Sequence, residues 1–111
     1  MDILLNQHKF DEWISKIRKV SDPIQAMLNA KQYLGPDTIF LPSDKPTKKY
    51  TIFDPNKKEY IYFGDIRYTD YTKHKDKKRK KNYLKRSSNI KGNWKEDKYS
   101  PNNLSREILW K

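Results

Sequence analysis

The sequence predicts an α+β fold: an N-terminal helical pair, a small antiparallel β-hairpin or sheet, a basic helix and a short C-terminal helix. Three observations support this prediction. Apolar residues recur at helical spacing in the first third of the chain, β-branched and aromatic runs follow, and a lysine-rich stretch with capping signals comes next. Fifteen aromatic residues among 111 supply apolar surface for a core, so we expect a folded chain although 35% of its residues are charged.

Two helices are expected in the first third. One over about residues 8–20 follows from apolar side chains at the i, i+3, i+4, i+7 spacing of an amphipathic helix. A second, over residues 23–34, begins where Asp22 is an N-cap followed by proline at the first helical position, and ends at Gly35-Pro36. The apolar residues of the first helix are Phe10, Trp13, Ile14, Ile17 and Val20.

The sequence predicts β-strands in the middle of the chain. Residues 38–41 form a short strand candidate, and residues 49–53 and 59–63 are β-branched and aromatic runs. Residues 54–58 contain Asp-Pro-Asn and predict a hairpin with a five-residue turn, while Gly64 is expected to end the second strand. Both hairpin faces carry large side chains, so one face packs and the other offers Tyr50, Tyr60 or Tyr62 outward.

A polar link over residues 42–48 separates two parts of different charge. Residues 1–44 hold 5 Lys and Arg against 6 Asp and Glu, whereas residues 45–111 hold 20 against 8. We therefore predict a helical N-terminal segment (1–44) and a basic β-hairpin plus helix module (45–111) within one compact domain.

The positive charge is concentrated in residues 73–91, where ten Lys and Arg face Asp76 as the only acidic residue. We predict a basic helix over about residues 74–87, capped by Thr72 or Asp76. On such a helix, four like-charged i, i+4 pairs would each cost about 0.2–0.5 kcal/mol, on the order of 1–2 kcal/mol together. A bound polyanion would remove this cost. The pairs are Lys73/Lys77, Lys75/Arg79, Lys77/Lys81 and Lys81/Lys85.

Aromatic residues lie among these cations, a combination typical of nucleic-acid binding, although a charge run is also typical of a solvated helix face. Because lysine outnumbers arginine in the run, we expect backbone contacts without sequence specificity. If about six cations contact duplex phosphates, the slope of log K against log salt should be about −5. The candidate binding residues are Lys73, Lys75, Lys77, Lys78, Arg79, Lys80, Lys81, Lys85, Arg86 and Lys91, with Tyr83 and Trp94 as stacking platforms.

The remaining segment is expected to dock on the core. Residues 87–99 read as a loop anchored by Ile90 and Trp94. Ser100 caps a short helix that begins at Pro101, and its apolar residues should pack on the rest of the fold. These residues are Leu104, Ile108, Leu109 and Trp110.

Enzymatic signals are weak. The chain has no cysteine and only isolated glycines, which excludes thiolate chemistry and a glycine-rich phosphate cradle. His74 beside Asp76 leaves a small metal-dependent nuclease as an alternative, although His-x-Asp is equally a capping arrangement. We expect a non-enzymatic protein with no cofactor and no bound metal. No stretch approaches the length of a membrane span, and the apolar patch over residues 1–5 is too short for a signal-peptide core.

Residues spread over much of the chain resemble a family of small basic proteins of unassigned function, encoded by large nucleocytoplasmic DNA viruses and some tailed phages. The resemblance lies in Lys48-Lys49-Tyr50-Thr51-Ile52, Tyr62-Phe63-Gly64, residues 68–76, Arg79-Lys80, Asn82-Tyr83-Leu84, Arg86, Leu104-Ser105 and Leu109-Trp110, with Asp22-Pro23 and residues 31–35 as a similar lead-in.

The resemblance implies a viral setting: a virion-associated or capsid-associated protein, also present in the host cytoplasm or virus factory. We expect no membrane partner, because no stretch approaches the length of a membrane span. Two partners fit the charge. One is nucleic acid, most readily the packaged DNA. The other is an acidic capsid protein surface, which would make the chain a minor capsid or scaffold protein.

Overall fold

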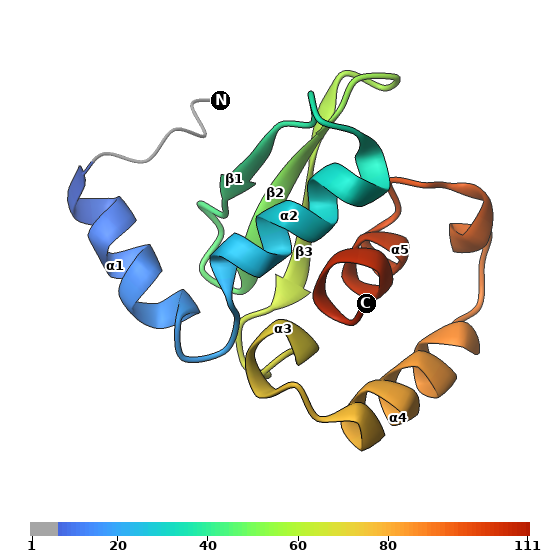
Figure 1. Ribbon diagram of the computed structural model, residues 1–111. Helices are drawn as coiled ribbons and strands as arrows, with labels where there is room; N and C mark the ends of the chain where they lie inside the picture. Colours follow the sequence, from blue (N-terminus) through green and yellow to red (C-terminus); the bar gives the residue numbers. More distant parts are fainter. Residues whose placement is uncertain (1–6) are drawn as a thin grey trace.

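The computed structural model of the protein describes residues 7–111, so the apolar patch predicted over residues 1–5 lies outside the described residues. Figure 1 shows helices packed against a small antiparallel sheet, which confirms the predicted α+β fold. In chain order the elements are α1 (Gln7–Ile17), α2 (Pro23–Leu34), β1 (Phe40–Pro42), β2 (Lys48–Asp54), β3 (Glu59–Asp65), α3 (Tyr71–His74), α4 (Lys77–Ser88), the 3-10 turn η1 (Trp94–Glu96), α5 (Pro101–Leu104) and the π-helical turn η2 (Ser105–Leu109).

The predicted helical pair is confirmed. The Asp22 side chain accepts hydrogen bonds from the backbone N–H groups of Ile24 and Gln25, and Gly35, with φ of 111°, follows the last residue of α2. α1 ends at Ile17, three residues earlier than predicted, because the chain turns there and the backbone N–H of Ser21 donates to the Ile17 carbonyl at 2.8 Å. In the described part of the chain, no helix is long and apolar enough to cross a bilayer.

The sheet has the order β1-β2-β3 with both pairs antiparallel, so the predicted hairpin is confirmed. The predicted five-residue turn is wrong, because Asp54 pairs with Glu59 and leaves a four-residue turn over residues 55–58. The Asp54 side chain accepts from the backbone N–H groups of Asn56 and Lys57 and thereby fixes the turn. The strands differ from their predicted bounds by one or two residues: β1 covers Phe40–Pro42 rather than 38–41, β2 covers Lys48–Asp54 rather than 49–53, and β3 continues past Gly64 to Asp65.

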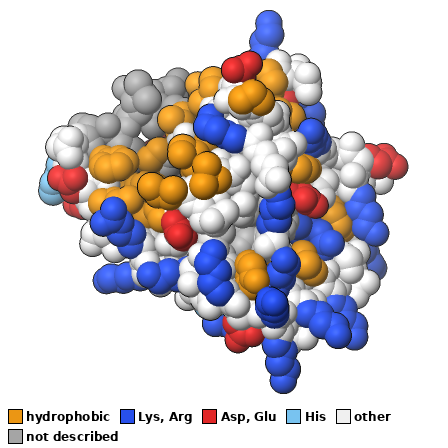
Figure 2. Space-filling view, in the orientation of Figure 1, with side chains coloured by type: hydrophobic (Ala, Val, Ile, Leu, Met, Phe, Trp, Pro, Cys, Tyr) orange, Lys and Arg blue, Asp and Glu red, His pale blue; other side chains and the backbone are white. Residues whose placement is uncertain are grey.

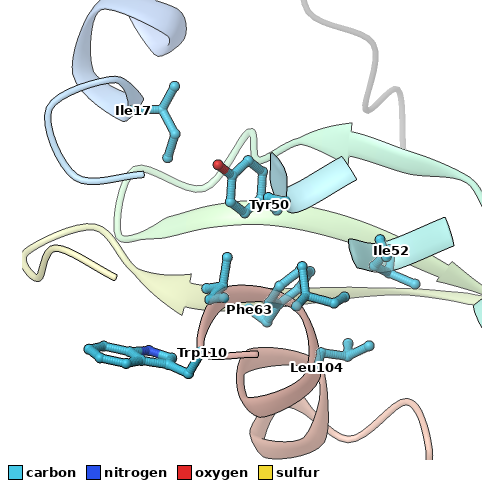
Figure 3. Close-up of a cluster of buried hydrophobic side chains, with 10 residues drawn as sticks. Ile17, Tyr50, Ile52, Phe63, Leu104 and Trp110 are labelled. Atoms are coloured by element: carbon cyan, nitrogen blue, oxygen red, sulfur yellow. The ribbon is translucent and has the colours of Figure 1, made fainter. Parts of the chain in front are cut away.

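One face of the sheet forms the core with α2 and the C-terminal helical segment (Figure 3). Tyr50, Ile52 and Phe63 are fully buried there, because alternate strand residues point to the same face. The prediction that Tyr50 points outward is therefore wrong: its hydroxyl donates to Ser21 Oγ at 2.7 Å. Tyr60 is exposed.

The C-terminal segment docks as predicted. Ser100 Oγ accepts from the backbone N–H of Asn103, and four residues that follow are buried in the core. Asn29 of α2 donates to the Ile108 carbonyl at 2.8 Å, which joins the two layers. The prediction that Ile90 anchors the loop is wrong, because its side chain is 53% exposed. The buried residues are Leu104, Ile108, Leu109 and Trp110.

Gly64 occupies a position that excludes a side chain. Its φ is +82°, and a Cβ there would lie 2.9 Å from Leu109 Cδ1 and 3.1 Å from two atoms of Lys49. Gly64→Ala is therefore expected to lower the free energy of unfolding by about 2–4 kcal/mol, through left-handed strain plus overpacking. Urea denaturation measures the loss. Gly92→Ala is the matched control, because Gly92 also has positive φ but nothing within 4 Å of its Cβ position. Equal losses for the two variants would contradict the steric argument.

Candidate nucleic-acid interface

The basic stretch forms two helices rather than the single predicted one. Lys75 adopts the left-handed conformation (φ 59°, ψ 20°) and ends α3, which Asp70 caps. Asp76 then caps α4 by accepting from the backbone N–H groups of Lys78 and Arg79 at 3.0 and 3.2 Å. Of the two predicted caps, Asp76 is confirmed and Thr72 is wrong, because the Thr72 side chain is buried and hydrogen-bonded within the fold.

This break changes the electrostatic cost of the run. The two residues of the pair Lys73/Lys77 do not share a helix, and neither do those of Lys75/Arg79. The prediction that the two residues of each of these pairs repel each other as i, i+4 neighbours is therefore wrong. Lys77/Lys81 and Lys81/Lys85 remain on α4, and together they cost about 0.4–1 kcal/mol. The repulsion energy within α4 is thus about half of the value expected from the sequence for all four pairs.

α4 is attached to the rest of the molecule along one side. The Tyr83 ring stacks on Trp110 with centroids 4.2 Å apart and planes within 10°. Arg106 Nη1 donates to the Leu84 carbonyl at 2.7 Å, and Asn102 Nδ2 donates to the Ser87 carbonyl at 3.1 Å. Burial raises the pKa of Tyr83, with a hydrogen bond to Ser105 opposing the shift. The predicted platform Tyr83 therefore has one ring face covered by Trp110.

The opposite side of α4 carries three lysines at i, i+3 and i+7: Lys78, Lys81 and Lys85. We call these residues the lysine stripe. All three are exposed, and none forms an ion pair within residues 7–111. In Figure 2, Lys and Arg side chains gather over the region where Figure 1 places α4. The stripe is therefore a continuous row of cations on the side of α4 opposite to the side that docks on the rest of the molecule.

The other predicted binding residues differ in how exposed they are. Lys80 is half-buried with Nζ 4.7 Å from the Tyr71 ring centroid. Trp94 is half-buried, with the Lys95 ammonium and the Arg106 guanidinium each 5.5 Å from its ring. The rings of Tyr71 and Trp94 are thus already in contact with cations of this chain. The remaining predicted cations are exposed: Lys73, Lys75, Lys77, Arg79, Arg86 and Lys91.

A hollow of about 590 Å³, which the sequence did not predict, lies between α4 and the segment around the end of β3. Two arginines from α4 line it, and we call it the arginine hollow. No lysine of α4 is among its lining residues. They are Lys49, Gly64, Asp65, Tyr68, Thr69, Arg79, Asn82, Tyr83, Arg86, Ser105, Leu109 and Trp110.

Behind the hollow lies a buried ion pair. Lys49 Nζ is 3.1 Å from Asp70 Oδ2, and the two side chains are 3% and 0% exposed. Asp70 Oδ1 also accepts from the backbone N–H of Thr72 at 3.0 Å and from its hydroxyl. The Thr72 hydroxyl lies 3.1 Å from that of Ser21, which extends the network to the turn between α1 and α2. Burial lowers the pKa of Lys49, while the Asp70 carboxylate opposes that shift.

His74 packs between aromatic rings, with centroids 6.0 Å from Tyr71 and 5.2 Å from Trp110. Its Nδ1 accepts the backbone N–H of Asp76 at 2.9 Å, and burial lowers the pKa of the imidazole. The Asp76 carboxylate caps α4. Within residues 7–111 there is no group of three His, Cys, Asp or Glu side chains placed to hold a metal ion.

Comparison with known proteins gives one match, in the middle of the chain. Residues 39–87 match the model of a family of unknown function (DUF5754). The match runs from just before β1 to near the end of α4, so it includes the whole sheet and the lysine stripe. No curated protein and no solved structure matches the chain. Over these 49 of its 111 residues the chain is similar to a family whose function is unknown, and the viral setting stays an expectation.

Proposed function

We propose that the protein binds the nucleic-acid backbone without sequence specificity and without catalysis, through the lysine stripe of α4. The observation that carries this proposal is the row formed by Lys78, Lys81 and Lys85, which is exposed and has no acidic partner among residues 7–111. Phosphate charges are the ligands that such a row of point charges suits best.

Geometry and charge support a repeating polyanion as the partner. On a helix the three lysines span about 10 Å along the axis, a length over which duplex DNA carries several phosphates. Asp76 does not neutralise them, because it caps the first turn of α4. Lysine ammonium groups contact phosphate as point charges and read no base edges, so specificity is not expected.

In the viral setting that the sequence resemblance implies, the partner we propose is the packaged genome and the location is the virion. The alternative partner, an acidic capsid protein surface, would use the same cations. It predicts stoichiometric association with a shell protein and little affinity for free DNA.

A charge-reversal experiment tests the proposal. Changing Lys78, Lys81 and Lys85 to Glu should lower affinity for a fluorescent duplex about 100-fold at about 150 mM salt. The slope of log K against log salt should change from about −5 to about −3, because three phosphate contacts are lost.

The matched control reverses the exposed cations Lys16, Arg18 and Lys19 at the end of α1. Each triple variant takes the formal net charge from +11 to +5, so a difference between them reports position rather than total charge. Far-UV circular dichroism should match the wild type in both. Unchanged binding by the stripe variant, or equal losses in the two, would refute the assignment. Absence of duplex binding by the wild-type protein would instead favour the acidic protein surface.

A further inference from the structure

Arginine and lysine occupy different sides of α4. Arg79 and Arg86, the only arginines of the helix, both line the arginine hollow with Asn82 between them. The spacing i, i+3, i+7 places all three on one side of the helix. The lysine stripe begins one residue earlier and runs along the neighbouring side.

The two arginines are the uncompensated charges of the hollow. Its other charged lining residues are Lys49, which pairs with Asp70, and Asp65, which the Arg67 guanidinium holds at 2.8 Å. Neither α4 arginine forms an ion pair within residues 7–111 or donates a side-chain hydrogen bond there. Arg106 differs, because its guanidinium donates to the Leu84 carbonyl.

A pair of free guanidinium groups over one hollow suits a phosphate. Each guanidinium presents a planar fork of N–H donors that matches phosphate oxygens two at a time, which a lysine ammonium cannot do. The volume of about 590 Å³ is within the range of sites that enclose a small organic group. The hollow therefore has room for more than the phosphate.

The opposite wall supplies a ring. Tyr68 lines the hollow and is 60% exposed. The Arg67 guanidinium carbon, 5.4 Å from the ring centroid, covers one face of the ring. The other face has no ring or cation contact within residues 7–111, unlike Trp94, which has two cations over its ring. An exposed aromatic face beside a cationic groove is the usual platform for an unpaired base. The Asn82 amide adds one donor and one acceptor, which can bond to a sugar hydroxyl or a base edge.

We propose that the arginine hollow takes one unpaired nucleotide of a strand, with its phosphate between Arg79 and Arg86 and its base against Tyr68. The proposal rests on the proposed function and deepens it: the lysine stripe binds backbone in any form, whereas the hollow favours single strands over duplexes. A base paired inside a duplex cannot reach Tyr68 without leaving its stack.

The test keeps total charge constant. In the double variant Arg79→Lys and Arg86→Lys, affinity for a single strand of about ten nucleotides should fall about tenfold, with duplex affinity changed less than about twofold. Tyr68→Leu should lower single-strand affinity to a similar extent. The matched control is Arg18→Lys, at an exposed arginine that lies outside both the arginine hollow and the lysine stripe; it should change neither affinity by more than about twofold.

Other outcomes separate this inference from the function on which it rests. If the Arg→Lys variant binds both nucleic acids as the wild type does, or loses both equally, the hollow is not a nucleotide site, and the charge-reversal result for the stripe still stands. If the wild type binds no duplex, 5′-adenosine monophosphate followed by amide NMR shifts tests the hollow alone. Shifts at Asn82 and Tyr68 that disappear in the Arg→Lys variant support the site, and their absence overturns it.

Discussion

Asp70→Ala is expected to lower the free energy of unfolding by about 3–5 kcal/mol, because it leaves the ammonium of Lys49 buried without its partner. The Lys49 and Asp70 side chains are 3% and 0% exposed, so the ammonium is largely shielded from the water that would solvate it once the carboxylate is lost. The substitution also removes the acceptor for the Thr72 backbone N–H and hydroxyl. An uncompensated buried charge is among the most destabilising results of a single substitution.

Urea denaturation of Asp70→Ala and of Asp65→Ala compares the free energy of unfolding that each variant loses. Asp65 also pairs with a cation, at 2.8 Å from Arg67, but both side chains of that pair are substantially exposed, so its loss should cost less than about 1 kcal/mol. Lys49→Met in the Asp70→Ala background should recover part of the stability, because it removes the unpaired charge. A loss for Asp70→Ala no larger than that for Asp65→Ala would show that the ion pair is not what stabilises this region.

Trp110→Ala is expected to cost about 3–5 kcal/mol as well, and to loosen α4 more than the rest of the fold. Trp110 is 9% exposed and lies against two rings, those of Tyr83 and His74. Its removal deletes a large part of the core and the stacked contact that holds α4. The amides of α4 should therefore exchange faster in the variant than those of β2 and β3.

Trp94→Ala is the matched control, because Trp94 is half-buried and lies outside the core cluster. Its loss should cost about 1 kcal/mol or less. Chemical denaturation gives both free energies, and hydrogen exchange gives the distribution along the chain. Uniform acceleration of exchange in Trp110→Ala, without preference for α4, would mean that the stacked contact does not attach the helix.

The elements with local signals were predictable from the sequence. Asp22-Pro23 and Gly35 define α2 at both ends, because capping and proline geometry involve only neighbouring residues. The hairpin follows from two aromatic runs and an Asp-Pro-Asn turn. The break at Lys75 was missed because a lysine with positive φ has no sequence signature. The two acids Asp70 and Asp76, each an N-cap, were the available sign of two helices.

The candidate site was predictable only in part. That α4 carries many lysines follows from composition, whereas which of them form the lysine stripe depends on the side by which the helix docks. The side on which Tyr50 lies did not follow, because both faces of the hairpin carry large residues and alternation gives no preference. Lys49 and Asp70 are separated by 21 residues, and their pairing depends on how β3 leads into α3. The arginine hollow is assembled from β2, β3, α4 and the C-terminal segment, so only the tertiary fold reveals it.

The contacts that attach α4 also bear on the order in which the chain folds. They join α4 to later residues, Ser87 to Asn102 across 15 positions and Leu84 to Arg106 across 22. Docking must wait for the loop to close, and a 12-residue helix with repelling lysines is only marginally stable before it docks. A polyanion that binds the lysines removes this repulsion. Nucleic acid is therefore expected to raise the helix content of α4 in a partly unfolded chain, before the helix is fixed on the core.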